Sequence, residues 1–316
     1  MKFSVALPSA YEGLGYPIGM VRDPGALALL ARAAERLGYD GVWANDHLVT
    51  PRFLRGSADG PPAFYEPLVT LAHVAAVTTR IGIGTAVLAL PLREPALLAK
   101  QAATLDALSG GRLILGVGLG AYPEELAAVR PDRAAARRGT LFDEALVGLR
   151  RWSDDTASAP RRRIPLYVGG HGTQAIARAA RLGDGWIPGW QPLPELRRRI
   201  ALLREECARA GRDPRSVAVA PELSASIAGR HEYAVARYEA SRFVRHRRSR
   251  GRTGRDASLM AASNLVGSPD TIRERVAGLA EAGVDHCAAL AFPAESVGEL
   301  VEQWQAFAAA IVADRR

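Results

Sequence analysis

The residue pair best able to do chemistry, Asp46 and His47, stands at the end of a predicted strand over Gly41–His47. A histidine side chain ordinarily gives and takes a proton near neutral pH, and an adjacent carboxylate can fix its tautomer. We therefore treat His47 as a candidate proton donor or acceptor and Asp46 as the carboxylate that orients it. A histidine that only satisfies a backbone carbonyl at a strand end is the alternative interpretation of this dipeptide.

Alternating glycines end another predicted strand, Leu113–Gly118, and continue beyond it at Gly120. Glycine lets the backbone approach a flat or phosphorylated ligand where a side chain would collide. Gly118 and Gly120 are therefore candidate cofactor contacts. A strand packed tightly against its neighbours is the alternative, because glycine alternation alone fits that arrangement as well.

A third strand end combines glycines with a helix start. The predicted strand Pro165–Gly169 runs into a Gly-His-Gly stretch, and a helix is predicted to open through a threonine. The N–H groups and the dipole of a helix N-terminus bind phosphate. A tight strand-to-helix turn with a threonine cap is the alternative. The candidate phosphate-binding residues are Gly169, Gly170, His171, Gly172 and Thr173.

Short apolar runs alternate with longer amphipathic ones, which indicates strands alternating with helices such as His231–Arg248. Near-continuous apolar strands are typical of a parallel sheet buried on both faces. Eight of them favour one (βα)8 TIM barrel over residues 1–316, with its chemistry at the C-terminal strand ends. A doubly wound sheet is the alternative, but no Gly-x-Gly-x-x-Gly or P-loop follows the first strand. The predicted strands are Phe3–Pro8, Gly41–His47, Ile81–Leu88, Leu113–Gly118, Pro165–Gly169, Gly185–Pro188, Val217–Ile227 and His286–Phe292.

Composition argues against several classes of protein. Cys207 and Cys287 have no Cys-x-x-Cys spacing, which favours a reducing cytoplasm, and no cluster has metal-ligand spacing. The absence of a signal peptide or a long apolar run predicts a cytoplasmic protein that does not bind membranes. Seven arginines crowd Arg242–Arg255, either as solvated surface or as an electropositive rim for an anionic ligand. Without interleaved aromatic residues, this segment does not indicate nucleic-acid binding.

Taken in order, many segments resemble the bacterial luciferase-like monooxygenase superfamily, and most closely its branch of oxidoreductases that depend on the deazaflavin coenzyme F-420. The resemblance covers nearly the whole chain. The segments that carry it are Ala33–Trp43, Asp46-His47, Tyr65–Leu68, Thr79–Thr85, Ala99–Arg112, Arg138–Glu144, Val168–Gly170, Arg178–Trp186 and Val266–Pro269.

The resemblance implies a flavin-type ring at the C-terminal end of an eight-stranded barrel, with His47 beside its reactive centre and Asp46 next to it. It also implies a non-prolyl cis peptide between Ala86 and Val87 behind the ring, with Thr85 in the same cofactor-contacting segment. The glycine-rich loop after the fifth strand is expected to hold the cofactor phosphate. A homodimer and a small organic substrate are further expectations.

The expected reaction is hydride transfer between coenzyme F-420 and the organic substrate. A reduced-FMN monooxygenase and a non-catalytic flavin-binding barrel are the alternatives, because they share this fold. The chain departs from the family at Ala121, where some relatives carry an acid or a tryptophan, and in the shortened segment Ser153–Ile164.

Overall fold

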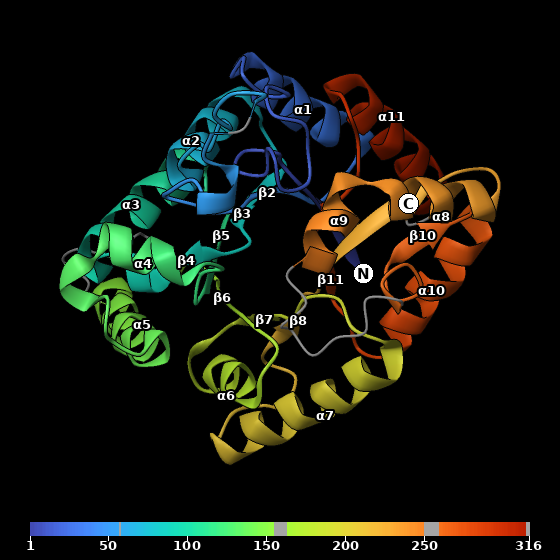
Figure 1. The fold of residues 1–316 in the computed structure, drawn as a ribbon. Coiled ribbons are helices and arrows are strands. Elements are labelled where there is room, and N and C mark those ends of the chain that lie inside the picture. Colours follow the sequence, from blue (N-terminus) through green and yellow to red (C-terminus); the bar gives the residue numbers. More distant parts are fainter. Residues whose placement is uncertain (57, 155–162, 250–258, 314–316) are drawn as a thin grey trace.

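The computed structural model describes residues 1–56, 58–154, 163–249 and 259–313. Its strands are parallel and form a central barrel, and the helices lie around the outside (Figure 1). The strands are β1 Lys2–Ala6, β2 Gly41–Ala44, β3 Gly82–Thr85, β4 Leu88–Ala89, β5 Leu113–Gly118, β6 Leu166–Gly169, β7 Gly185–Ile187, β8 Ala218–Val219, β9 Glu222–Ile227, β10 Leu265–Gly267 and β11 His286–Ala291.

The α-helices alternate with the strands along most of the chain. They are α1 Gly25–Leu37, α2 Pro67–Val77, α3 Pro95–Leu108, α4 Pro123–Val129, α5 Arg138–Asp154, α6 Thr173–Leu182, α7 Leu193–Arg209, α8 His231–Ala240, α9 Arg242–Ser249, α10 Pro269–Glu281 and α11 Val297–Phe307. Short turns of 3-10 helix include η1 Arg52–Leu54 and η2 Leu90–Leu92. Among these residues no helix is both long and apolar enough to span a lipid bilayer.

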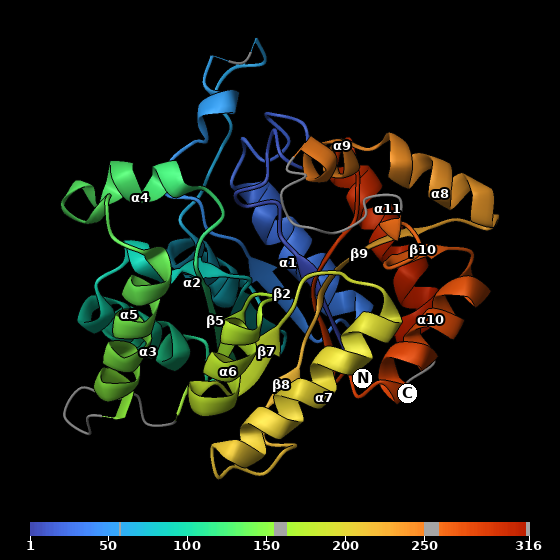
Figure 2. The same ribbon diagram turned by 60° about the horizontal axis from the view of Figure 1, so that its bottom comes forward.

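The strand order closes the sheet on itself. β1 pairs with β2 on one side and with β11 on the other, and the order continues β2-β3-β5-β6-β7-β8. The segment that holds β8 and β9 completes the ring, since the N–H of Glu222 donates to the carbonyl of Pro188 at 2.8 Å while β9 pairs with β11. The predicted (βα)8 barrel is therefore confirmed, and its C-terminal strand ends lie at the top of Figure 2.

Two predicted strands are each divided in the structure. The segment Val217–Ile227 splits at Pro221, because a proline has no N–H to continue the ladder, and there the chain changes neighbours from β7 to β11. The segment Ile81–Leu88 splits at a cis peptide bond between Ala86 and Val87, which the resemblance predicts and the structure contains.

The structure also contains elements that the sequence patterns did not predict. A short helix, α4, follows β5. β10 pairs with the C-terminal half of β9, Ala225–Ile227. The predicted helix His231–Arg248 breaks at Ser241, whose backbone is extended and whose Oγ accepts the N–H of Val244 at 3.3 Å. Ser241 therefore caps the start of α9, as serine commonly does at a helix N-terminus.

Candidate active site

His47 follows β2 at the C-terminal end of the barrel and is buried, with 8% of its surface exposed. Its Nδ1 lies 3.1 Å from Oε1 of Glu125, a residue of α4 that is 1% exposed. Among the described residues the other carboxylate oxygen, Oε2 of Glu125, is buried and has no hydrogen-bond partner. Since buried polar atoms are nearly always paired, this oxygen marks a position where a ligand group would be stabilised.

Asp46 does not orient His47, which corrects the prediction from the sequence. Its Oδ1 and Oδ2 accept hydrogen bonds from Arg93 at 2.9 and 3.2 Å, and Oδ2 also accepts the N–H of Ala89 at 2.9 Å. Burial raises the pKa of Asp46, while the Arg93 guanidinium and the Ala89 N–H oppose that rise. Arg93 also pairs with Glu66, the residue that caps α2. Asp46 therefore joins the end of β2 to neighbouring segments. Glu125, and not Asp46, is the carboxylate that bonds to the imidazole of His47.

Ring side chains surround the imidazole of His47. The ring of Tyr122 lies 5.3 Å from it between centroids and that of Phe64 lies 5.6 Å away. Tyr122 directly precedes α4, so the same connection after β5 supplies both this ring and Glu125. The position of Glu125 was open to prediction in part, because Pro123 followed by two glutamates is a typical helix start.

Val87, which follows the cis peptide bond, explains two of the predicted site glycines. A Cβ at Gly118 would lie 2.4 Å from Val87 Cγ2, and a Cβ at Gly169 would lie 2.8 Å from Val87 Cγ1. Both glycines therefore leave room for a protein side chain. Thr85 is fully buried, and its hydroxyl bonds both to the carbonyl and to the N–H of Gly116.

Ala86 follows β3 and Gly120 follows β5, so both lie at the C-terminal end of the barrel. Gly120 has a φ of +80°, a conformation that favours glycine, and its carbonyl accepts a hydrogen bond from Arg138 at 3.0 Å. Ala86 is 8% exposed and donates its N–H to the carbonyl of Ala44 in β2. A direct contact of Thr85, Ala86, Val87, Gly118 or Gly120 with a cofactor stays a prediction.

The predicted phosphate loop lies between β6 and α6. Gly172 caps α6 with its backbone alone, since no described side chain caps this helix, so Thr173 is the first helical residue and not the cap. A Cβ added at Gly172 would meet nothing within 4 Å. By contrast, Gly170 has a φ of +132° and donates its N–H to the carbonyl of Ile187. The amides of the first α6 turn are therefore suited to an anion, whereas the N–H of Gly170 already serves the fold.

Two residues beside this loop were missed at the sequence level. Arg199 of α7 donates a hydrogen bond to the carbonyl of His171, which brings a guanidinium to the loop. Gln191 follows β7, is 7% exposed, and its Nε2 has no partner among the described residues. The loops after β6 and β7 also touch directly, because the N–H of Gly189 donates to His171 Nδ1 at 3.1 Å. Only the fold reveals this combination, since these residues lie far apart in the chain.

The arginine-rich segment is described only up to Ser249, and Arg250, Arg252 and Arg255 lie outside the described residues. The arginines of α9 are ion-paired or bonded to a carbonyl, and Arg242 and Arg248 are still 43% and 45% exposed, so the solvated surface and the ligand-facing rim both stay predictions. Arg245 donates to the carbonyl of Ala240. The ion pairs are Arg242–Glu295, Arg247–Glu222 and Arg248–Glu239.

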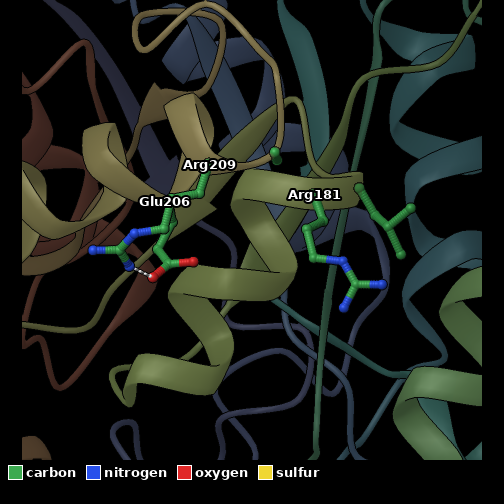
Figure 3. Close-up of a pocket in the computed structure, with 5 residues that line it drawn as sticks. Arg181, Glu206 and Arg209 are labelled. Atoms are coloured by element: carbon green, nitrogen blue, oxygen red, sulfur yellow. Dashed lines mark hydrogen bonds and ion pairs between the residues drawn. The ribbon is translucent and has the colours of Figure 1, made fainter.

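A surface hollow of about 410 Å³ lies at the opposite end of the barrel, between the C-terminal ends of α6 and α7 (Figure 3). Arg209 is ion-paired with Glu206 there, and the side chain of Arg181 points away from that pair. The hollow contains none of the predicted site residues. Within the described part of the chain, no three histidine, cysteine or acidic side chains are grouped to hold a metal ion.

Comparison with known proteins places the chain in a family. The family described as luciferase-like monooxygenase matches residues 1–286, and the protein belongs to that family. F420-dependent glucose-6-phosphate dehydrogenase of Kineococcus radiotolerans is 35% identical over 181 residues, which are 52% of this chain and 52% of the dehydrogenase. The chain thus matches about half the length of that relative.

Solved structures share the fold over the whole chain. The monooxygenase RslO1 from Streptomyces bottropensis superposes with a TM-score of 0.78 at 21% identity, and each chain is fully covered. An F420-dependent secondary alcohol dehydrogenase in complex with an F420-acetone adduct gives 0.77 at 18% identity, covering 100% of this chain and 99% of the other. These similarities establish the luciferase-like TIM barrel.

Proposed function

We propose that the protein is an oxidoreductase that uses coenzyme F-420 to transfer hydride to or from an organic substrate. The observation that carries the proposal is the buried His47–Glu125 pair at the C-terminal end of a luciferase-like barrel. A curated relative at 35% identity is named as F420-dependent, which favours the deazaflavin over FMN. When bound, the deazaflavin supplies the hydride chemistry, and the protein supplies binding, orientation and proton handling.

The residues present fit such a cofactor. The N-terminus of α6, which has no side-chain cap among the described residues, offers N–H groups to a phosphate. Gly172 leaves open space in front of them. Arg199 adds a positive charge beside that loop, and the buried Nε2 of Gln191 is a further donor that has no protein partner among the described residues. We assign these three positions to the phosphorylated tail.

His47 would move the proton. Glu125 accepts a hydrogen bond from the protonated Nδ1, which leaves Nε2 as the ring atom that exchanges a proton with the substrate. A carboxylate in this position stabilises the imidazolium when His47 takes up the proton, and fixes the ring orientation throughout. Burial of both residues keeps bulk water from competing for the proton.

A spectroscopic titration tests the choice of cofactor. The purified protein is titrated with oxidised F-420 and, separately, with FMN, and binding is followed by the visible absorbance of each. We expect tighter binding of F-420 and no oxygen consumption during turnover. Tighter binding of FMN together with oxygen uptake would overturn the proposal in favour of a reduced-FMN monooxygenase. Cofactor binding without any turnover that responds to His47→Ala would identify a non-catalytic flavin-binding barrel.

We also propose that the protein forms a homodimer through α1, α2 and α3. These helices pack side by side and expose apolar side chains on their outer faces: Leu29 is 51%, Val69 70% and Leu97 60% exposed. Light scattering is expected to give the mass of a dimer, and Val69→Lys combined with Leu97→Lys that of a monomer. Tyr233→Lys on α8 is the matched exposed control and is expected to stay dimeric. A monomeric wild-type protein would refute this interface.

A further inference from the structure

Ring side chains from three segments that are distant in sequence meet near His47. Phe53 and Phe64 come from the connection between β2 and α2, Tyr122 precedes α4, and His246 lies on α9. Figure 2 shows this connection, α4 and α9 at the same end of the barrel. The cluster formed by His47, Phe53, Phe64, Tyr122 and His246 is called the ring cluster below.

The ring cluster is held together by stacking and by one hydrogen bond. Tyr122 Oη lies 3.2 Å from His246 Nε2. The ring of Phe53 stacks on His246 at 5.8 Å and 21°, and lies 5.9 Å from the ring of Tyr122. Nevertheless, Phe53 is 58% exposed. An aromatic side chain that stays exposed beside the Tyr122 ring contributes little to the core, and offers a flat face to a ligand.

The carboxylate of Glu125 disfavours an anionic ligand beside His47. Arg93 is ion-paired with Asp46 and Glu66, and Arg247 with Glu222, so both guanidinium groups already have carboxylate partners. Oε2 of Glu125, in contrast, is a buried acceptor without a partner among the described residues. An anion placed there would meet a carboxylate, whereas an uncharged hydroxyl group would not be repelled.

We propose that, in the oxidoreductase inferred above, the ring cluster is the substrate subsite and selects an uncharged alcohol whose carbinol carbon carries a flat apolar ring. The ring of the substrate stacks on Phe53 and Tyr122. Its hydroxyl donates its hydrogen bond to Nε2 of His47, and the carboxylate of Glu125 repels a negatively charged substrate. This assignment excludes substrates that carry a phosphate or a carboxylate group.

Three probes that share a secondary carbinol group test the substrate class by binding alone. 1-Phenylethanol has the ring and the hydroxyl, mandelate replaces its methyl group by a carboxylate, and 2-butanol lacks the ring. Their dissociation constants are measured by calorimetry on protein saturated with F-420, and on protein without it. We expect 1-phenylethanol to bind about tenfold more tightly than either of the others, since a ring stack and an unrepelled hydroxyl each contribute about that factor. Equal or tighter binding of mandelate or 2-butanol would overturn the proposal.

Two variants connect the preference to the residues. Phe53→Ala is expected to weaken 1-phenylethanol binding several-fold and to leave 2-butanol binding unchanged. Tyr233→Ala removes a ring that is 60% exposed on α8, next to Arg230, and is the matched control with no expected effect. Glu125→Gln removes the negative charge, and is expected to reduce the discrimination against mandelate. Unchanged selectivity in both Phe53→Ala and Glu125→Gln would show that the ring cluster is not the subsite.

The cofactor titration separates this proposal from the proposed function. If F-420 fails to bind but 1-phenylethanol still binds in preference to mandelate, the substrate class stands and the choice of cofactor is wrong. If F-420 binds and the three probes are not distinguished, the oxidoreductase stands and the substrate class is wrong.

Discussion

His47 and His286 are both buried in the barrel and both hydrogen-bonded, yet their surroundings differ. His47 lies at the C-terminal end beside Glu125, a carboxylate with one oxygen to spare. His286 opens β11 at the other end, where its Nε2 lies 2.7 Å from Ser4 Oγ and its ring meets Trp43 edge to face. A carboxylate stabilises a charged imidazole through its negative charge, whereas a hydroxyl has no charge with which to do so. Burial alone therefore does not identify a functional histidine, and the charge of its partner does.

The largest expected effect is on turnover when His47 is changed. His47→Asn removes the group that exchanges a proton, so kcat is expected to fall by about 10²–10⁴-fold. The melting temperature is expected to stay close to that of the wild type, because the amide can still donate to Glu125. Steady-state kinetics and calorimetry measure the two quantities. A variant with full kcat would mean that the two histidines do not differ in function.

The opposite result is expected at His286. His286→Ala leaves the buried Ser4 hydroxyl without this partner and opens a cavity beside Trp43, so it is expected to cost about 2–4 kcal/mol of unfolding free energy. Urea unfolding measures this loss, and kcat per folded molecule is expected to be retained. A large loss of kcat in fully folded protein would place His286 in the chemistry and contradict the comparison.

Glu125→Gln sharpens the comparison at the carboxylate. The amide keeps a hydrogen-bonding oxygen but loses the negative charge that stabilises a protonated His47, so kcat is expected to fall about tenfold. An unchanged kcat would show that Glu125 only fills space. Asp46→Asn is the companion variant. It is expected to lower the stability of the fold, because it removes the negative charge that pairs with Arg93.

Two glycines of the proposed phosphate loop allow the same separation of ligand binding from folding. Gly172→Asp adds a helix cap in open space, so it is expected to add a few tenths of a kcal/mol of stability. Its carboxylate would occupy the phosphate position, so F-420 binding is expected to weaken about tenfold or more. Gly170→Ala strains a φ of +132° and presses on Ala175, so it is expected to reduce stability. Unchanged cofactor affinity in Gly172→Asp would move the phosphate away from α6.

The smallest expected effect concerns Glu35, a carboxylate of α1 that serves the fold at the same end as His286. Burial alone would raise its pKa, but the N–H groups of Arg80, Ile81 and Thr79 outweigh burial and lower the pKa from 4.5. Glu35 therefore stabilises the fold above pH 4.5, and this contribution is lost as the pH falls through the lowered pKa. Glu35→Gln is expected to flatten the acid limb of the stability profile slightly. An unaltered limb would show that these hydrogen bonds contribute nothing.

The sequence by itself determined the barrel, the position of His47, the Ala86–Val87 cis peptide and the glycine-rich loop before α6. These features depend on local patterns: apolar periodicity, glycines at strand ends, and segments that resemble a family in order.

Only the tertiary structure decided which partner each site residue has. Asp46 adjoins His47 in sequence but binds Arg93, whereas Glu125 is 78 residues away and binds the imidazole. The same holds for Arg199 at the phosphate loop and for His246 at Tyr122. The physical reason is that successive side chains near the end of a strand point to different sides, so adjacent residues separate while loops from different strands converge at the barrel end.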